Sequence, residues 1–116
     1  MTKGLQDLLE KGNEITLAIH RFRNNESTYV SYLKKFLVDP TYEQFKFCVT
    51  SKDYEHARSY CSALNGVASN LGLTNIAKCT ASLSYRLYKN DFENMKLDME
   101  TLESSYNETV SLIERV

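Results

Sequence analysis

Apolar residues recur at intervals of three and four along most of the chain, a spacing typical of helices that bury one face. The clearest case is the segment 52–71. Its apolar positions, in order, are Tyr54, Ala57, Cys61, Leu64, Ala68 and Leu71. They fall on one side of a helix, like the seam of a helical bundle. We therefore expect 52–71 to be a helix with this side in the core.

Polar residues and a glycine mark the expected ends of this helix. Ser51 is placed to cap its N-terminus, with the carboxylates of Asp53 and Glu55 in the first turn, near the positive end of the helix dipole. Gly72 follows the last apolar position, as glycine commonly does just past a helix C-terminus. These signals make 52–71 the best-defined helix of the sequence.

Similar breaks divide the rest of the chain into further helices. They are expected near residues 3–11, from 13 onward, and over 26–50, 74–89 and 91–115. Within 26–50 the helical period continues past Asp39-Pro40, so we expect a bent arm in which the proline kinks or restarts the helix. Four long amphipathic elements joined by short turns predict an all-α protein: an antiparallel four-helix bundle with short N-terminal helical segments. At 116 residues, the chain is expected to be a single domain over 1–116.

Composition and charge argue against several classes of function. The chain is 42% hydrophobic and 25% charged, which is ordinary for a globular domain. It has 14 Lys and Arg residues against 15 Asp and Glu residues, without a basic cluster, so neither nucleic acid nor an anionic membrane is an expected partner. The carboxylates are dispersed, with no metal-ligand grouping and no catalytic dyad. We therefore expect no enzyme activity, no bound metal and no cofactor.

The cysteines and the N-terminus bear on the cellular compartment. Cys48, Cys61 and Cys79 are odd in number and lack C-x-x-C spacing, so we expect reduced thiols in the core. No apolar run approaches the ~20 residues of a membrane span. The first residues, Met1 to Leu5, lack the apolar core of a signal peptide. A cytoplasmic protein is the expectation.

The stretch 61–72 carries a sequence motif. It reads Cys-Ser-Ala-Leu-Asn-Gly-Val-Ala-Ser-Asn-Leu-Gly. It resembles the helix His-x-Leu-Lys-Gly-x-Ala-x-x-Leu-Gly of histidine-containing phosphotransfer (HPt) domains, which relay phosphoryl groups in bacterial and plant two-component systems. The positions in register are Leu64, Gly66, Ala68, Asn70, Leu71 and Gly72. Residues 18–22, Tyr29 and residues 33–36 look like the family's N-terminal part, so the resemblance covers roughly residues 14–90.

Two positions of the motif depart from the family. Ser62 stands where the family has the phosphorylated histidine, and Asn65 replaces a lysine that helps to neutralise the transferring phosphate. A serine hydroxyl is a poor nucleophile without an activating base. Its phosphate ester would also be too stable to return the group to an aspartate. The resemblance therefore implies a domain of the HPt type that has lost its phosphoacceptor.

The expected site lies on the outer face of the 52–71 helix. With about 100° per residue, Ser62 and Gly66 fall well away from the apolar seam. Their neighbours at helical spacing are Arg58, Asn65 and Ser69, so these five residues are the predicted partner-binding surface. In the family, the glycine four residues after the histidine leaves room for the partner. The resemblance implies that this partner is the receiver domain of a response regulator or a histidine kinase.

The residues leave other assignments open. An active phosphotransfer protein could use His56 or His20, or Ser62 could replace a native histidine. His56 lies six residues before Ser62, which turns the two side chains roughly 120° apart. A motif shifted by one residue would place Cys61, a seam residue, at the acceptor position. A structural bundle that forms a homodimer is the third alternative. The favoured hypothesis is a pseudo-phosphotransfer module that binds a two-component partner as a competitor or adaptor.

Overall fold

The computed structural model describes residues 1–116 and is helical, with no β-strand. Its helices are α1 (Lys3–Glu10), α2 (Ile15–Arg21), α3 (Glu26–Phe36), α4 (Thr41–Thr50), α5 (Tyr54–Asn70), α6 (Thr74–Tyr88), the short 3-10 helix η1 (Phe92–Asn94) and α7 (Met95–Glu114). The all-α prediction is confirmed, and the expected helix over 52–71 corresponds to α5. No helix combines the length and the apolar character needed to cross a membrane.

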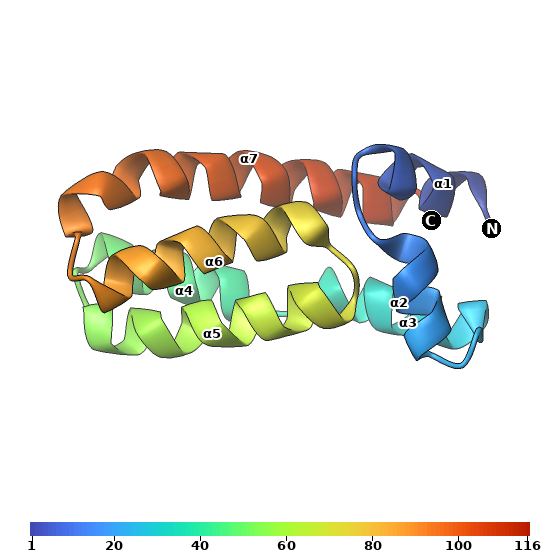
Figure 1. Ribbon diagram of the computed structural model, residues 1–116, viewed down its shortest axis with the longest axis horizontal. Coiled ribbons are helices and arrows are strands. Elements are labelled where there is room, and N and C mark those ends of the chain that lie inside the picture. Colours follow the sequence, from blue (N-terminus) through green and yellow to red (C-terminus); the bar gives the residue numbers. More distant parts are fainter.

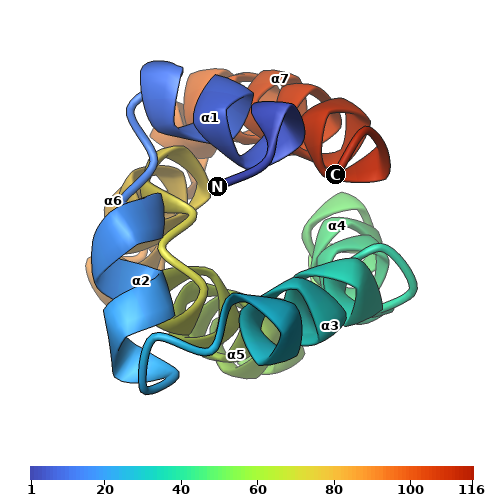
Figure 2. The ribbon, with the colours of Figure 1, turned by 90° about the vertical axis from the view of Figure 1, so that its right-hand side faces the viewer.

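Helices α4 to α7 run side by side in alternating directions along a molecule that measures 41 × 21 × 21 Å (Figure 1). α5 packs against α4 and α6, and α6 packs against α7. α1 packs against α7 and α2, while α2 crosses the long axis at one end. Seen along that axis, α1, α2 and α3 lie at the near end, with α4, α5 and α6 behind them (Figure 2).

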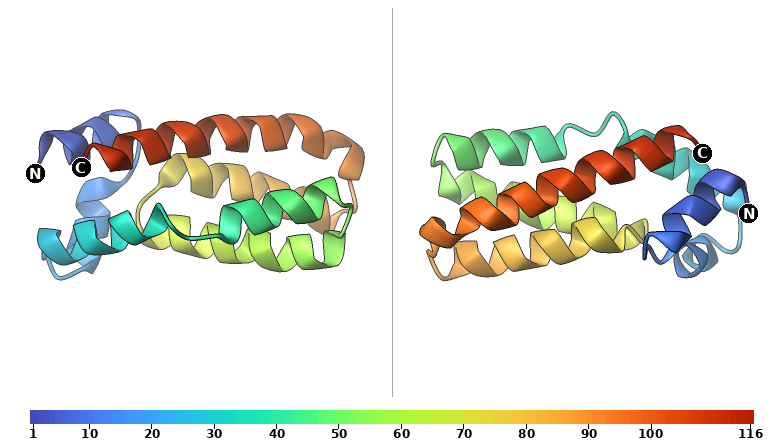
Figure 3. Two further views of the ribbon diagram at one scale, coloured as in Figure 1. Left: turned by 180° about the vertical axis from the view of Figure 1, so that it is seen from behind. Right: turned by 90° about the horizontal axis from the view of Figure 1, so that it is seen from above.

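The segment 26–50 contains a break between α3 and α4, which lie roughly end to end along one side of the molecule (Figure 3). The Asp39 carboxylate accepts hydrogen bonds from the backbone N–H of Thr41 at 2.9 Å and from its hydroxyl at 2.6 Å. Pro40 stands at the N-cap of α4, where a missing N–H leaves no helical hydrogen bond unmade. The proline therefore restarts the helix and does not kink a continuous one.

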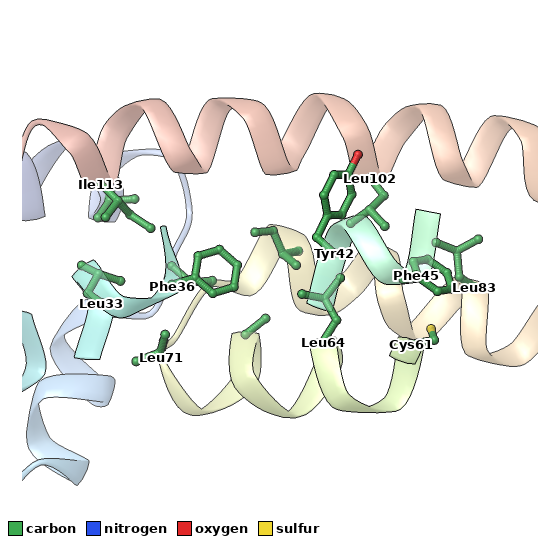
Figure 4. Packing of buried hydrophobic residues seen from close by; sticks show 14 of the residues in the cluster. Leu33, Phe36, Tyr42, Phe45, Cys61, Leu64, Leu71, Leu83, Leu102 and Ile113 are labelled. Carbon is green, nitrogen blue, oxygen red and sulfur yellow. The ribbon is translucent and has the colours of Figure 1, made fainter. Parts of the chain in front are cut away.

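The core is one cluster of 23 buried hydrophobic residues to which every α-helix contributes. On α5, the seam residues Cys61, Leu64 and Ala68 are buried, as their spacing predicts (Figure 4). Tyr29 of α3 is also fully buried, and its hydroxyl donates to the Leu71 carbonyl oxygen at 2.7 Å. Burial raises the pKa of Tyr29 far above its ordinary value, so the hydroxyl keeps the proton that it donates.

The junction between α4 and α5 differs from the prediction. Lys52 adopts the left-handed conformation with φ of 60°, and the N–H of Asp53 donates to the Cys48 carbonyl oxygen at 2.8 Å. This is the Schellman arrangement, in which the left-handed position is usually glycine. Ser51 therefore belongs to the end of α4, and Asp53 is the N-cap of α5. The prediction that Ser51 caps the motif helix is wrong because Lys52 ends the preceding helix without a glycine.

Candidate functional site on the outer face of α5

The predicted site residues form one stripe along α5, which we call the α5 outer stripe. Its members are Arg58, Ser62, Asn65, Gly66 and Ser69. Four of them are exposed, and Asn65 is half-buried. The stripe faces away from the seam residues Cys61 and Leu64, which lie in the core. The structure therefore brings the five residues together on one surface.

Asp53 fixes the N-terminus of α5. Its carboxylate accepts a hydrogen bond from the His56 backbone N–H at 3.3 Å, and His56 Nδ1 lies 2.8 Å from the other carboxylate oxygen. These contacts, the backbone hydrogen bond first, hold the pKa of Asp53 below its ordinary value. The His56 imidazole, 67% exposed, is thus paired with the residue that caps its own helix.

The C-terminus of α5 is held by α2. The Arg21 guanidinium donates to the carbonyl oxygens of Ser69 at 2.8 Å and Asn70 at 3.1 Å. A cation is favourable there because it meets the negative end of the helix dipole. Gly72 follows with φ of +73°, and a Cβ on it would lie 2.6 Å from the Glu14 carbonyl oxygen. The helix that bears the stripe is therefore anchored at both ends.

Asn65 connects α5 to α6. Its amide nitrogen donates to the Ala77 carbonyl oxygen and to Thr80 Oγ1, each at 3.0 Å. Thr80 is fully buried, and its hydroxyl donates in turn to backbone carbonyls of α6. Helical spacing places Asn65 on the correct face but does not reveal the neighbouring helix. Asn65 therefore also has a structural role, because it joins α5 to α6 at the edge of the stripe.

Arg58 also contacts α6. Its guanidinium donates to the Leu87 carbonyl oxygen at 3.2 Å and to Asn90 Oδ1 at 2.7 Å. The positive charge therefore lies at the C-terminal end of α6, where the helix dipole favours it. Arg58 is exposed and is the only cation of the stripe.

Gly66 occupies an open position of the stripe. A Cβ placed on it would meet no atom within 4 Å. Ser62, one turn earlier, and Ser69, one turn later, are exposed as well. The exposure predicted for Ser62 is confirmed. This part of the stripe is a helix surface that carries only short side chains.

The neighbouring edge of α6 was not singled out from the sequence. Ala77 lies beside Asn65, and Ala81, Ser84 and Tyr88 follow it along the same side of α6 at helical spacing. Ala81 and Ser84 are exposed, and Tyr88 is 77% exposed. Counting by three and four groups them on one side of α6, but only the contact of Ala77 with Asn65 shows that this side adjoins the stripe. Small side chains thus continue from the stripe onto α6 and end at an exposed tyrosine.

Cys61 is next to this surface in the sequence but belongs to the buried side of α5. It is fully buried, and its Sγ lies 3.3 Å from the Thr80 carbonyl oxygen. Burial raises the pKa of the Cys61 thiol to about 12, so it is protonated at neutral pH. A motif shifted by one residue, with this cysteine as the acceptor, is therefore incompatible with the structure.

The histidines and the possible metal-ligating residues do not cluster. His20 is exposed in the last turn of α2, and His56 pairs with Asp53. No group of three or more His, Cys, Asp or Glu side chains is placed to hold a metal ion. Comparisons with protein families, curated proteins and solved structures give no match for this chain. The function is therefore inferred from the sequence and the structure of this chain.

Proposed function

We propose that this protein is a pseudo-phosphotransfer module of a two-component phosphorelay. It is an antiparallel four-helix bundle of the HPt type that docks a receiver domain or a histidine kinase without carrying the phosphoryl group. By occupying the docking surface of that partner, it acts as a competitor or adaptor for an active phosphotransfer protein. The observation that carries the proposal is Gly66, an exposed glycine inside α5, one turn before its last residue Asn70.

The two glycines of the motif differ in what they do for the fold. Gly72 is required by its positive φ and by the close approach of Glu14. Gly66 meets no such requirement, because a Cβ there would have no neighbour within 4 Å. A glycine inside a helix nevertheless costs about 1 kcal/mol relative to alanine. Clearance for a partner that packs closely against α5 accounts for this residue.

The surroundings of Gly66 also suit close approach. Ser62 and Ser69 carry short polar side chains, and Ala81 and Ser84 are exposed nearby on α6. The distance between packed helices depends on the side chains at the contact, so small residues allow a partner helix to lie near the backbone. A helix of a receiver domain fits such a surface.

The chemistry of a relay is missing from the same surface. Ser62 has no activating base beside it on α5, because His56 lies six residues earlier and the two side chains point roughly 120° apart. Asn65 supplies no positive charge, and the Arg58 guanidinium is engaged by the end of α6. A serine without a base is a poor nucleophile. We infer that binding remains and that phosphoryl transfer does not.

The decisive experiment compares two substitutions of Gly66. Both Gly66→Ala and Gly66→Gln should raise the melting temperature, because both residues favour helix more than glycine does. Gly66→Gln should weaken binding to the cognate receiver domain by at least ~1.4 kcal/mol, a factor of ten. Gly66→Ala, which adds one carbon atom, serves as the control and should lose much less. Calorimetric titration against the receiver domains of the source organism measures the affinity of both variants. Thermal denaturation measures their melting temperatures.

Two outcomes would contradict the proposal. One is that Gly66→Gln binds the receiver as tightly as the wild type, which would mean that the glycine provides no clearance. The other is that no receiver or kinase binds, while sedimentation shows a homodimer that Gly66→Gln disrupts. That result would favour a structural bundle that dimerises through the α5 outer stripe.

One observation favours a second candidate, a phosphotransfer protein that uses His56. The Asp53 carboxylate holds His56 Nδ1 at 2.8 Å, which leaves Nε2 free on an exposed ring. Incubation with a labelled phosphorylated receiver distinguishes the two candidates. We expect no acid-labile phosphate on the wild type. Label that appears and is lost in His56→Gln would establish the second candidate.

A further inference from the structure

A concave surface lies between α4 and α7, which can both be followed from behind in Figure 3. α5 and α6 pack directly on one another, whereas a groove of about 340 Å³ separates α4 from α7. We call it the α4–α7 groove. Its apolar lining consists of Tyr42, Val49, Tyr54, Phe92, Met95 and Met99. None of these residues belongs to the α5 outer stripe.

Two stacked aromatic pairs flank the groove. Tyr54 and Phe92 stack with ring centroids 3.8 Å apart and planes 4° from parallel. Tyr42 and Tyr106 stack at 3.8 Å and 13°. Tyr42 is 3% exposed and Tyr106 is half-buried, so this pair is tied to the core. Tyr54 and Phe92 are half-buried and both line the groove, so this pair leaves aromatic surface that a ligand ring can contact in offset or edge geometry.

Two methionines give the groove a lining that can adapt its shape. Met95 is almost completely buried, and Met99 is half-buried one turn further along α7. Methionine is unbranched and polarisable, so it adjusts to irregular apolar shapes and makes favourable contacts with aromatic rings. Only three methionines occur in the chain, and two of them line this groove.

The charged rim is balanced. Two lysines and two glutamates line the groove: Lys46, Lys96, Glu100 and Glu103. Lys46 of α4 lies 4.0 Å from Glu103 of α7 and so spans the two helices. Equal numbers of both signs leave no net charge to attract an ion of either sign. Because this ion pair bridges α4 and α7, the groove suits a compact molecule better than a helix, whose row of side chains would need it open along its length.

We propose that the α4–α7 groove binds a small, uncharged, mainly apolar molecule that contains an aromatic ring. The volume lies within the range of about 300–1,000 Å³ that is usual for small-molecule sites, and a mostly apolar lining with a few polar groups is also typical of them. Such a ligand would contact α4 and α7 together and so join the two helices across their groove. The site is separate from the surface proposed for receiver docking and does not depend on it.

The first test uses the wild-type protein with methionine methyl groups labelled for NMR. The probe is phenylnaphthylamine, an uncharged amine that carries a naphthyl and a phenyl group, and its comparator is anilinonaphthalene sulfonate, which has the same rings and a negative charge. We expect the Met95 and Met99 signals to shift and saturate with the uncharged probe, while Met1 stays unchanged as an internal control. The sulfonate should bind at least about tenfold more weakly.

Substitutions then locate the probe. Val49→Trp fills the groove from α4, and Thr50→Trp narrows it at an exposed rim position whose replacement leaves the core untouched. Each should reduce affinity for the uncharged probe by about tenfold or more. Phe47→Trp is the matched control on the same helix, since Phe47 is 71% exposed and does not line this groove.

Three results would overturn the assignment. The first is the absence of saturable shifts at Met95 and Met99, or equal shifts at Met1. The second is unchanged probe affinity in Thr50→Trp together with a folded Val49→Trp that also binds normally. The third is a shift of Met95 and Met99 that depends on protein concentration without probe, which would make the groove a contact between copies of the chain.

Discussion

The two faces of α5 obey different constraints. The inner face buries Cys61, Leu64 and Ala68 in the shared core, so the choice of these residues is explained by packing. On the outer face, Ser62 and Gly66 touch nothing that the fold requires. The inner face therefore accounts for most of the stability that α5 contributes, and the outer face adds the hydrogen bonds of Arg58 and Asn65 to α6. Any role of Ser62 and Gly66 must lie outside the monomer, and this division between the two faces can be tested by substitution.

The largest effect is expected from the inner face. Leu64 is 1% exposed, so Leu64→Ala removes buried methyl groups and leaves a cavity. We expect it to lower the free energy of unfolding by about 2–5 kcal/mol. Ser62→Ala, two residues earlier on the outer face, should stay within about 0.5 kcal/mol of the wild type. Urea denaturation measures both, and comparable losses in the two variants would contradict the division.

The two glycines of the motif provide a second test, because replacement by alanine should change the stability in opposite directions at the two positions. Gly72→Ala forces alanine into a left-handed conformation, with Cβ 2.6 Å from the Glu14 carbonyl oxygen and 2.9 Å from Ala18 Cβ. It should destabilise the protein by about 2 kcal/mol or more. Gly66→Ala should stabilise it by about 1 kcal/mol. If thermal melts show that both substitutions destabilise, Gly66 has a role within the fold after all.

The inner face could be predicted from the sequence to a greater extent than the helix junctions. Spacing by three and four located the buried residues of α5, because a helix has a fixed period and a core needs a continuous apolar side. The sequence predicted Ser51 as the N-cap of α5, whereas the structure has Asp53 in this position. The cause is Lys52, a non-glycine residue with φ of 60°, which ends α4 where no sequence signal marked an end.

The sequence predicted which residues lie on the outer face, but not which residues of other helices they contact. Helical spacing placed Arg58 and Asn65 beside Ser62, and the structure agrees. It did not reveal that both side chains donate hydrogen bonds to α6, because periodicity within one helix contains no information about the helix packed beside it. The small residues of α6 were missed for the same reason.

A smaller effect is expected at Asp53, where the outer face begins. Its folded pKa is lowered, so its contribution to stability is present above its unfolded pKa of about 3.9 and is lost as pH falls through the folded value. Asp53→Ala should lower the melting temperature at neutral pH, though less than Leu64→Ala does, because the cap of α5 is lost. The difference from the wild type should disappear on acidification. Asp53→Asn, which keeps a capping oxygen, is the control and should melt near the wild type at neutral pH.

The smallest effect on stability, and the most informative for function, is expected from Ser62→His. Position 62 is exposed, so the free energy of unfolding should change by less than about 0.5 kcal/mol. If the outer face retains a docking geometry for receivers, the new imidazole nitrogen can attack the aspartyl phosphate of a bound receiver. The acyl P–O bond then breaks, a P–N bond forms and the receiver carboxylate leaves. We expect acid-labile label on Ser62→His and none on the wild type.

Ser59→His controls for an exposed histidine on the same helix outside the motif register, since Ser59 is exposed one turn earlier. It should acquire no label from the same receiver. Adding Asn65→Lys restores the family's cation but removes the two hydrogen bonds to α6, which should cost about 1 kcal/mol in stability. Ser62→His should therefore be tested alone before the pair. Equal labelling of Ser59→His and Ser62→His would show that the receiver does not dock in the motif register, and the outer face would lose its assignment as a docking surface.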